Sequence, residues 1–404
     1  MRFHRNLVLA CIEALHLIIN QSKYADKVIE SVLKKDKRWG ARDRAFIAQT
    51  VYDIVRNQRM YLHIAGVKTP LHTTEIWRLI SIWIVLNNFE LPEWKEFEKT
   101  PVRRIRGRYY ESSKSFVYKE SIPDWIDQLG RAQLGPKLWE KEVHALNQPA
   151  EVVLRLNTLK HTEKELINDL EKDGILTERI PAYPGALIAK ERSNLFKTNA
   201  FKNGYFEIQD ANSQLVAPFL DVQKGHRVID CCAGAGGKSL HLAALMQNKG
   251  QLIAMDIFLY KLNELKKRAK RAGAFNIETR LIEGKKSIKK LKHSADRVLI
   301  DAPCSGLGVL KRNPDAKWKL QPEHLNKLKE TQRQLLQEYS AMLKPGGKLV
   351  YATCSILPQE NEGQVETFLK SPAGESFICT QHKTLYAHKN GYDGFFMAQF
   401  EHQS

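Results

Sequence analysis

Apolar residues recur every three or four positions along the first part of the chain, from Arg5 to about Asn88. The spacing is clearest in one group of residues that would share one side of a helix: Ile76, Leu79, Ile80, Trp83 and Leu86. Because this spacing is that of amphipathic helices packed on one another, we expect a helical bundle here.

The helical pattern is lost between residues 90 and 123. Leu91-Pro92 interrupts it, and a basic stretch follows beside Tyr109 and Tyr110. The cations of this stretch are Arg103, Arg104, Arg106 and Arg108. We interpret the segment as a connector or as a surface that contacts phosphate groups, and a solvated basic loop is an equally good interpretation.

A small mixed α+β unit is expected next. Residues 152–157 alternate like a half-buried strand, and Arg155-Leu156-Asn157 places two polar side chains on one face of it. Thr162 and Glu165 have the spacing of a capping box, and Gly174 can end the helix that they begin.

From about Gly225 short apolar strands alternate with helices, which is typical of a parallel sheet. The expected strands are 227–230, 251–256, 280–282, 297–301 and 348–351, and the expected helices are 238–246, 259–272, 322–343 and 360–370. We therefore predict an α/β fold with a doubly wound, mostly parallel sheet in this part of the chain.

Positive charge is the unusual feature of the composition. The 404 residues include 63 Lys and Arg against 45 Asp and Glu, a formal net charge of +18, so the chain should attract a polyanion. The 6 cysteines are too scattered for a disulfide framework, which favours a reducing, cytoplasmic compartment. No CxxC pair is present and no apolar run approaches a membrane span, so we expect neither a metal nor a membrane partner.

A strand, a glycine-rich turn and a helix start follow one another in residues 228–238. The turn is not a phosphate-binding loop, because Cys232 stands where that motif needs glycine. The dinucleotide fingerprint also fails, since its third glycine falls on Ser239. A glycine turn without a phosphate signature suits S-adenosylmethionine. Asp256 ends the next expected strand, where a carboxylate can accept both ribose hydroxyls or simply cap a helix.

Two cysteines follow two of the expected strands, in Asp301-Ala302-Pro303-Cys304-Ser305 and Tyr351-Ala352-Thr353-Cys354-Ser355. With strand order 3-2-1-4-5 these strands are neighbours, roughly 4.8 Å apart, and both thiols can reach one substrate ring. Thiolate addition at C6 of cytosine gives an enamine whose C5 can take a methyl group. Such a thiol needs nearby positive charge or donated hydrogen bonds to ionise. Asp301 can hydrogen-bond the edge of the base.

These motifs resemble the RsmB/Sun (NOP/Sun) family of RNA cytosine-C5 methyltransferases, and the resemblance covers roughly residues 150–400. It includes further segments: Arg155-Leu156-Asn157, Gln209-Asp210-Ala211, Lys311-Arg312-Asn313-Pro314-Asp315, Pro358-Gln359-Glu360-Asn361-Glu362 and Asp393-Gly394-Phe395-Phe396. The N-terminal helices resemble, more loosely, the NusB-like RNA-binding domain, chiefly in residues 40–46. The resemblance implies a Rossmann-like class I S-adenosylmethionine-dependent methyltransferase domain.

By this resemblance Cys354 is the nucleophile that attacks C6, Cys304 assists release of the methylated product, and Asp301 contacts cofactor and base. The expected cofactor-binding residues are Cys232, Ala233, Gly234, Ala235, Gly236, Gly237, Lys238, Asp256, Glu283 and Asp301. Ala235 stands where many relatives have Pro. Glu283 is the expected substitute for an Asp that contacts the adenine end in relatives.

We expect three parts: a helical NusB-like domain with its basic connector at 1–145, the small α+β subdomain at 146–215, and the methyltransferase domain at 216–404. The expected protein is a monomer that methylates C5 of a cytidine in structured RNA, with ribosomal RNA favoured by the NusB-like region. Transfer RNA, DNA methylation, and a non-catalytic role in ribosome assembly are the alternatives. Lys311-Arg312 and Lys317-Trp318 should face the RNA, since they follow the Cys304 motif.

Overall fold

The structure is a computed structural model, and it describes residues 3–191 and 194–403. The chain divides into two compact units. The first comprises Met1–Gln148 and Leu310–Leu320, and the second comprises Pro149–Val309 and Gln321–Ser404. The sequence does not foresee that residues 310–320 join the first unit, and the boundaries expected at 145/146 and 215/216 stay predictions. No helix of the described residues is long and apolar enough to cross a membrane.

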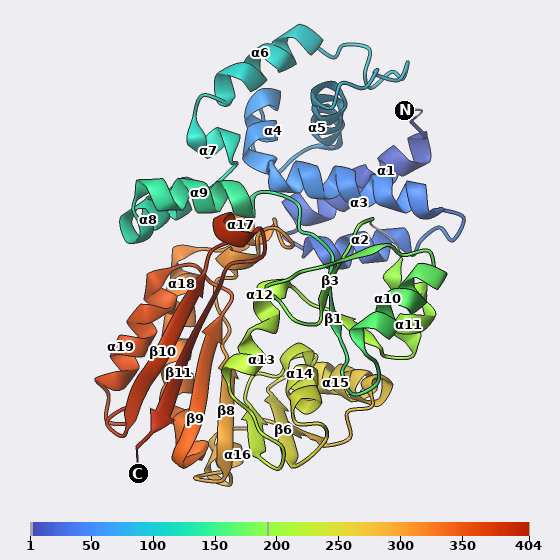
Figure 1. The fold of residues 1–404 in the computed structure, drawn as a ribbon. Coiled ribbons are helices and arrows are strands. Elements are labelled where there is room, and N and C mark those ends of the chain that lie inside the picture. The colour runs from blue at the N-terminus through green and yellow to red at the C-terminus, as the bar shows by residue number, and fades with distance from the viewer. Residues whose placement is uncertain (1–2, 192–193, 404) are drawn as a thin grey trace. The chain divides into compact units, whose positions relative to one another are not determined.

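The first unit is helical, as the apolar spacing predicts (Figure 1). Its core lies among α1, α3 and α5, where Cys11, Ile47 and Ile80 are buried. The elements are α1 (Arg5–Leu15), a π-helix (His16–Asn20), α2 (Ala25–Leu33), α3 (Ala41–Arg56), α4 (Gln58–Ala65), α5 (Thr73–Leu86), α6 (Val102–Ser112), α7 (Phe116–Lys119), α8 (Asp124–Leu134), α9 (Pro136–Leu146) and α17 (Ala316–Lys319).

Helix α6 corrects the expectation of a connector between residues 90 and 123. It contacts α4 and α5 and buries Ile105 and Ser112, while most of its basic side chains are exposed. A helix with so little buried apolar surface shows no periodicity in the sequence. The interpretation of this segment as a basic surface remains open.

Hydrogen bonds hold the segment 310–320 in the first unit. The Arg56 guanidinium donates to the carbonyl oxygens of Leu310 at 3.1 Å and Lys311 at 2.8 Å. The indole N–H of Trp318 donates to the carbonyl of Val55 at 2.7 Å. These buried bonds explain why the residues after the Cys304 motif belong to the helical unit.

Lys317 does not face the RNA in the way that the sequence suggested. Only 2% of it is exposed, and its ammonium donates to Oδ1 of Asn147 at 3.0 Å. Burial lowers the pKa of this ammonium well below its usual range, with the positive charge of Arg56 acting in the same direction. Lys317 is thus part of the packing of the first unit.

The second unit contains, in its described residues, a four-stranded antiparallel sheet in the order β2-β3-β1-β4. Helices α10 and α11 pack on one face of it. The predicted capping box of Thr162 and Glu165 begins α10. The elements are β1 (Val153–Leu156), α10 (Glu163–Lys172), β2 (Thr177–Arg179), β3 (Ala186–Ala189), a 3₁₀ turn (Leu195–Lys197), α11 (Asn199–Lys202) and β4 (Phe206–Ile208).

A larger sheet follows, and its described strands have the order β10-β11-β9-β8-β5-β6-β7. Its strands are β5 (Arg227–Asp230), β6 (Gln251–Asp256), β7 (Ile277–Leu281), β8 (Ala295–Asp301), β9 (Leu343–Thr353), β10 (Phe377–Leu385) and β11 (Phe395–His402). Its helices are α12 (Ala211–Gln214), α13 (Val216–Phe219), α14 (Gly237–Leu245), α15 (Leu259–Ala272), α16 (Lys285–Lys289), α18 (Pro322–Tyr339), α19 (Glu362–Leu369) and α20 (Ala387–Asn390). Short 3₁₀ turns lie at Leu307–Val309, Ser340–Met342 and Pro358–Glu360.

Strands β5 to β9 are parallel and confirm the expected order 3-2-1-4-5, whereas β11 is antiparallel to both β9 and β10. Alternate residues of a strand serve the two faces of the sheet. In β6, Leu252 and Ala254 pack with α14 and α15, while Ile253 and Met255 pack on the side of α18 and α19. The doubly wound α/β fold predicted from the sequence is therefore confirmed.

Candidate active site

The glycine-rich turn joins β5 to α14 at the carboxyl end of the sheet. Gly236 has a φ of +88°, and a Cβ atom there would lie 2.6 Å from Cγ of Leu265. A side chain at this position would both strain the backbone and collide with α15. Gly234 has a φ of +55° and donates its N–H to Oδ2 of Asp256 at 2.9 Å. The turn therefore requires these glycines for its own geometry.

Asp256, at the end of β6, is held by two backbone amides. Besides Gly234, the N–H of Phe258 donates to its Oδ1 at 2.8 Å. Each oxygen accepts one of these bonds and keeps a lone pair for a ligand. The carboxylate is thereby fixed in the position at which the sequence places a ribose-binding group.

A cavity of about 220 Å³ lies beside this carboxylate. Asp256 and Asp301 contribute carboxylates to its wall, and Cys232 and Gly234 contribute the turn. Its larger apolar side chains are Ile257, Phe258, Ile282, Leu335 and Tyr339. This donor set fits an adenosyl group, because carboxylates accept ribose hydroxyls and apolar side chains can pack on the adenine ring.

The other expected cofactor residues do not line this cavity. Five of them complete the turn around Gly234: Ala233, Ala235, Gly236, Gly237 and Lys238. Glu283 is exposed, and the lining residue from this part of the chain is Ile282. The role of Glu283 in adenine binding stays a prediction.

Cys304 and Cys354 lie just past the carboxyl ends of the neighbouring strands β8 and β9. Their Sγ atoms are 3.2 Å apart, within hydrogen-bond distance for sulfur. The hydrogen bond to Cys354 and burial raise the pKa of the Cys304 thiol well above its usual range. Cys304 therefore keeps its proton and can donate it to the Cys354 sulfur.

Lys238 brings a positive charge that interacts with Cys354. Its ammonium is 2.6 Å from Oδ2 of Asp301 and 5.2 Å from the centre of the Phe395 ring. Burial by itself would lower the pKa of this ammonium, but Asp301 and then Cys354 outweigh burial, and the pKa is raised. The sequence assigned Lys238 to the cofactor turn, whereas in the structure its charged end contacts Asp301.

Glu360 connects the two cysteine motifs; the sequence places it within a family motif but indicates no role for it. It is fully buried, and one of its oxygens accepts from the backbone N–H of Ser305 at 2.8 Å and from Nε2 of Gln332 at 3.0 Å. The hydroxyls of Ser305 and Ser355 both donate to the other oxygen. Because each serine directly follows a cysteine, Glu360 fixes the two thiol-bearing turns relative to each other.

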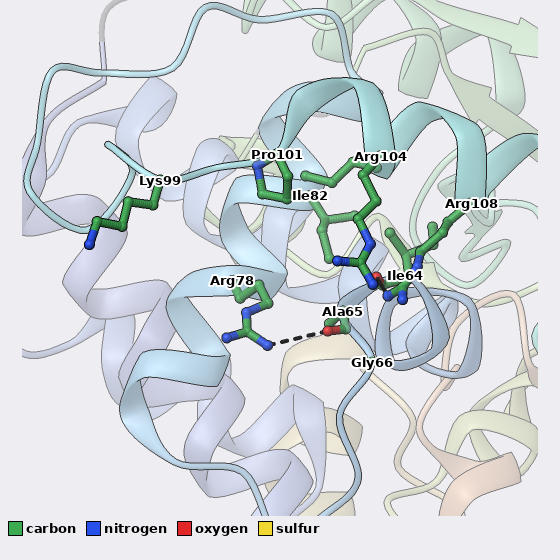
Figure 2. Close-up of a pocket in the computed structure, with 10 residues that line it drawn as sticks. Ile64, Ala65, Gly66, Arg78, Ile82, Lys99, Pro101, Arg104 and Arg108 are labelled. Carbon is green, nitrogen blue, oxygen red and sulfur yellow. Dashed lines mark hydrogen bonds between the residues drawn. The ribbon is translucent and has the colours of Figure 1, made fainter.

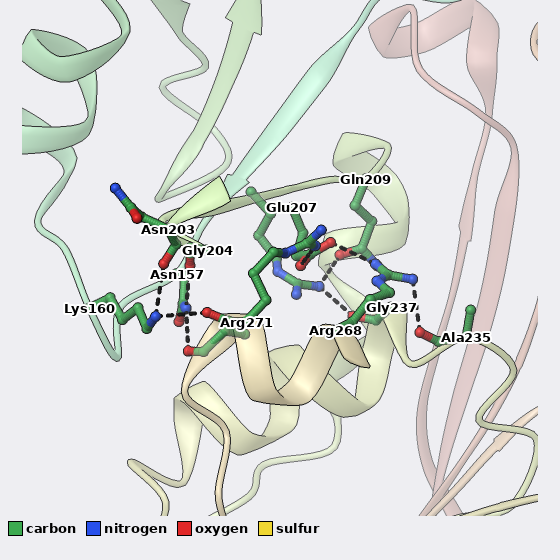
Figure 3. Close-up of polar contacts among 12 residues, drawn as sticks. Asn157, Lys160, Asn203, Gly204, Glu207, Gln209, Ala235, Gly237, Arg268 and Arg271 are labelled. Carbon is green, nitrogen blue, oxygen red and sulfur yellow. Dashed lines mark hydrogen bonds and ion pairs between the residues drawn. The ribbon is translucent and has the colours of Figure 1, made fainter. Parts of the chain in front are cut away.

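A second polar network holds the glycine-rich turn against β1 and β4 (Figure 3). Arg155 donates to the carbonyl of Gly237, and Arg268 donates to the carbonyl of Ala235 at 2.8 Å. Glu207 accepts from both Arg268 and Arg271. Burial lowers the pKa of Arg155 to about 10, so it still carries its charge at neutral pH. Arg155 of the Arg155-Leu156-Asn157 motif thus contacts the turn directly, whereas Asn157 donates to the carbonyls of Gly204 and Ala272.

The chain matches two family models. The model of the 16S rRNA methyltransferase RsmB/F matches residues 217–401, and that of the RsmF/B-like ferredoxin-like domain matches residues 122–195. The chain is 33% identical to a probable ribosomal RNA small subunit methyltransferase B of Synechocystis, over 95% of this chain and 96% of that protein. A protein of Bacillus subtilis with the same name is 28% identical, with 96% of each chain covered.

Among solved structures, the crystal structure of PH0851 has a TM-score of 0.85 and 27% identity over 99% of both chains. The fold and the cavity are those of a Rossmann-like class I methyltransferase. The chain belongs to the RsmB/F family of ribosomal RNA methyltransferases. The resemblance seen in the sequence is thereby confirmed, together with an RNA methyltransferase activity that uses S-adenosylmethionine.

Proposed function

We propose that this enzyme methylates C5 of a cytidine in small-subunit ribosomal RNA, through a covalent adduct between Cys354 and C6 of the base. The proposal is carried by the pair of sulfur atoms 3.2 Å apart, one of them directly after the cavity-lining segment that ends at Pro303. A cytosine ring placed against this pair lies within reach of both thiols.

The carboxylates divide their work between cofactor and base. When bound, S-adenosylmethionine supplies an electrophilic methyl group on its sulfonium. Asp256, in the wall of the cavity, would accept hydrogen bonds from the ribose hydroxyls. Asp301, which lines the same cavity and pairs with Lys238, hydrogen-bonds the edge of the base. Because Asp301 borders both sites, it sets the position of C5 relative to the cofactor.

Cys354 attacks C6 as a thiolate. The ammonium of Lys238 and the S–H of Cys304 both stabilise negative charge on its sulfur. The C–S bond forms as the C5–C6 double bond opens, and C5 becomes the nucleophile that takes the methyl group. The chain thus supplies the positive charge and the hydrogen-bond donor that a reactive thiolate needs.

Cys304 completes the reaction as a base. Its pKa is raised first by the hydrogen bond to Cys354, and this cause disappears once the Cys354 sulfur is bonded to carbon. The Cys304 thiol then loses its proton to water more easily, and the resulting thiolate takes the proton from C5. The electrons of the C–H bond restore the C5–C6 double bond, and the Cys354 sulfur leaves as a thiolate. Formation of the adduct therefore makes the Cys304 thiolate available as the base for the step that releases the methylated product.

The RNA class follows from the family, and its target base must leave any stacked or paired setting before a thiol can reach it. The proposed location is the cytoplasm, and one copy of the chain is proposed to suffice. Transfer of a labelled methyl group from S-adenosylmethionine to 16S ribosomal RNA, with transfer RNA and DNA as comparison substrates, tests the proposal. Digestion to nucleosides should place the label in 5-methylcytidine. Label in another nucleoside, or no label at any stage of subunit assembly, refutes it.

A further inference from the structure

A basic cavity lies within the first unit, between α4, α5 and α6. Its volume is about 410 Å³, and its lining includes four cations and no carboxylate: Arg78, Lys99, Arg104 and Arg108. Figure 2 shows the guanidinium groups of Arg78, Arg104 and Arg108 around the end of α4, at Ala65 and Gly66. Like charges gathered in this way repel one another unless an anion compensates them.

The described part of the chain supplies no such anion. Among the residues that the structure describes, no Asp or Glu oxygen lies within 4.0 Å of a charged nitrogen of these four side chains. The basic helix α15 differs, because its Arg268 and Arg271 share Glu207. The cavity therefore concentrates positive charge that packing within the fold does not explain.

Backbone oxygens orient two of the four cations. Arg108 donates to the carbonyl of Ile64 at 2.8 Å, and Arg78 donates to the carbonyl of Ala65 at 3.3 Å. Each guanidinium has five N–H donors, so most of them remain available for a ligand. These two bonds also cap the carboxyl end of α4, but capping gives no reason for Arg104 and Lys99 to line the same cavity.

The chemistry of the cavity selects a phosphate group. A guanidinium group can donate two parallel hydrogen bonds to the oxygens of one phosphate. The remaining lining is largely apolar and includes Ile64 and Ile82, so the cations are the side chains that a ligand can hydrogen-bond. Arg104 and Arg108 are four residues apart on α6 and so project from the same side of the helix. Two guanidinium groups can thus contact one phosphate together.

We propose that this cavity binds a phosphodiester group of the substrate RNA. The proposal rests on the proposed function for the statement that the ligand is RNA. A phosphate contact carries no sequence information, but it fixes the register of a nucleic acid on the protein. The cavity is therefore an anchoring site on the first unit. It binds the RNA backbone, whereas the thiols act on the base.

The test compares two double variants with equal loss of charge. Arg104→Gln/Arg108→Gln removes two cavity cations, and Lys137→Gln/Lys141→Gln removes two exposed lysines at the same spacing on α9, outside the cavity. Binding of a 16S ribosomal RNA transcript is measured against salt. The cavity variant should bind several-fold more weakly, and its slope of log Kd against log salt should be smaller by about 1. The lysine variant should keep the wild-type slope.

Melting temperatures show whether the cavity variant folds, and Arg104→Gln alone is the second variant, since Arg104 makes no hydrogen bond that holds α4. Equal slopes for the cavity and lysine variants would overturn the proposal. A second outcome would also overturn it: inorganic phosphate raises the melting temperature of the wild type but not of the cavity variant, while the two proteins bind RNA equally. The site would then hold a small anion and not the RNA. Loss of RNA binding in the cavity variant without any methylation by the wild type would sink the proposed function and leave the anchoring site standing.

Discussion

Cys304 and Cys354 are 50 residues apart in sequence, and their sulfur atoms approach to 3.2 Å because β8 and β9 pair in parallel. Two thiols at this distance cannot both carry a full negative charge, and in the proposed reaction one is therefore the proton donor and the other the nucleophile. The raised pKa of the Cys304 thiol favours Cys304 as the donor in this proposal. The two cysteines should therefore fail in different ways when each is removed.

Cys354→Ala should abolish methyl transfer, because it removes the sulfur that bonds to C6 in the proposed reaction. Cys304→Ala should still form that bond and transfer the methyl group, but the adduct should persist because its C5 proton stays in place. A denaturing gel with labelled RNA checks this, with Cys379→Ala on β10 as a thiol control that should leave turnover unchanged. An adduct in Cys354→Ala but not in Cys304→Ala would exchange the two roles.

Lys238→Met should reduce kcat by roughly a hundredfold or more, since the thiolate at position 354 loses a positive charge that interacts with it. Lys238→Arg keeps the charge and should recover part of the rate. The rate of alkylation of Cys354 by iodoacetamide at neutral pH gives a readout that does not depend on the RNA, and this rate should fall in Lys238→Met. An unchanged rate would show that Lys238 acts only by holding Asp301 in place.

Glu360→Gln should separate positioning from cofactor binding. Glutamine keeps one carbonyl acceptor, but its NH₂ group meets donors in place of the second carboxylate oxygen. We expect a loss of about 1–3 kcal/mol in stability and a lower kcat. The affinity for S-adenosylmethionine, measured by calorimetry, should stay near that of the wild type, because Glu360 does not line the cofactor cavity. A matched loss of cofactor affinity would contradict this separation.

The sequence predicts the parallel part of the fold well because buried strands such as β6, and the end of β9 at residues 348–351, contain short apolar runs. It misses β10, whose residues are mostly exposed and polar, so neither alternation nor an apolar run marks this edge strand. It misses α6 for the same reason. Both elements depend on packing against distant segments, which local spacing cannot report.

The residues of the candidate site also differ in whether the sequence could predict them. Cys304, Cys354 and Asp256 could be predicted because each follows a recognisable strand, and strand order brings their ends together. Glu360 and the Lys238–Asp301 pair could not, because their partners are distant in sequence and meet only in the folded chain. Motif spacing identifies the candidate groups for substrate and cofactor contact better than the groups that hold them in place.

Cofactor affinity should depend on Asp256 far more than on Glu283. Asp256→Asn removes the charge from a carboxylate in the cavity wall and should weaken S-adenosylmethionine binding by about 1–3 kcal/mol, a loss readable by calorimetry. Glu283→Gln removes an equal charge from an exposed position outside the lining and should change the affinity little. A loss as large in Glu283→Gln as in Asp256→Asn would restore Glu283 as an adenine contact.

The stability of the protein should fall as the pH rises from about 4 to 7, through Asp230. Burial raises the pKa of this carboxyl to about 7, although the hydroxyl of Ser239 donates to it at 2.6 Å. Below about pH 4 the group is protonated in both the folded and the unfolded chain. Between about pH 4 and 7 only the unfolded chain ionises, so the folded state loses about 4 kcal/mol in total relative to the unfolded chain. Above that range the contribution is constant.

Asp230→Asn cannot ionise and keeps a carbonyl that accepts from Ser239. Its stability relative to the wild type should therefore be higher at about pH 8 than at about pH 5, by roughly 2–3 kcal/mol. Melting temperatures of the full chain at both pH values provide the measurement. The other titrating groups change equally in both proteins and cancel in this comparison, as does any constant cost of the substitution. If the difference between the two proteins were the same at both pH values, Asp230 would be ionised in the folded protein throughout this range.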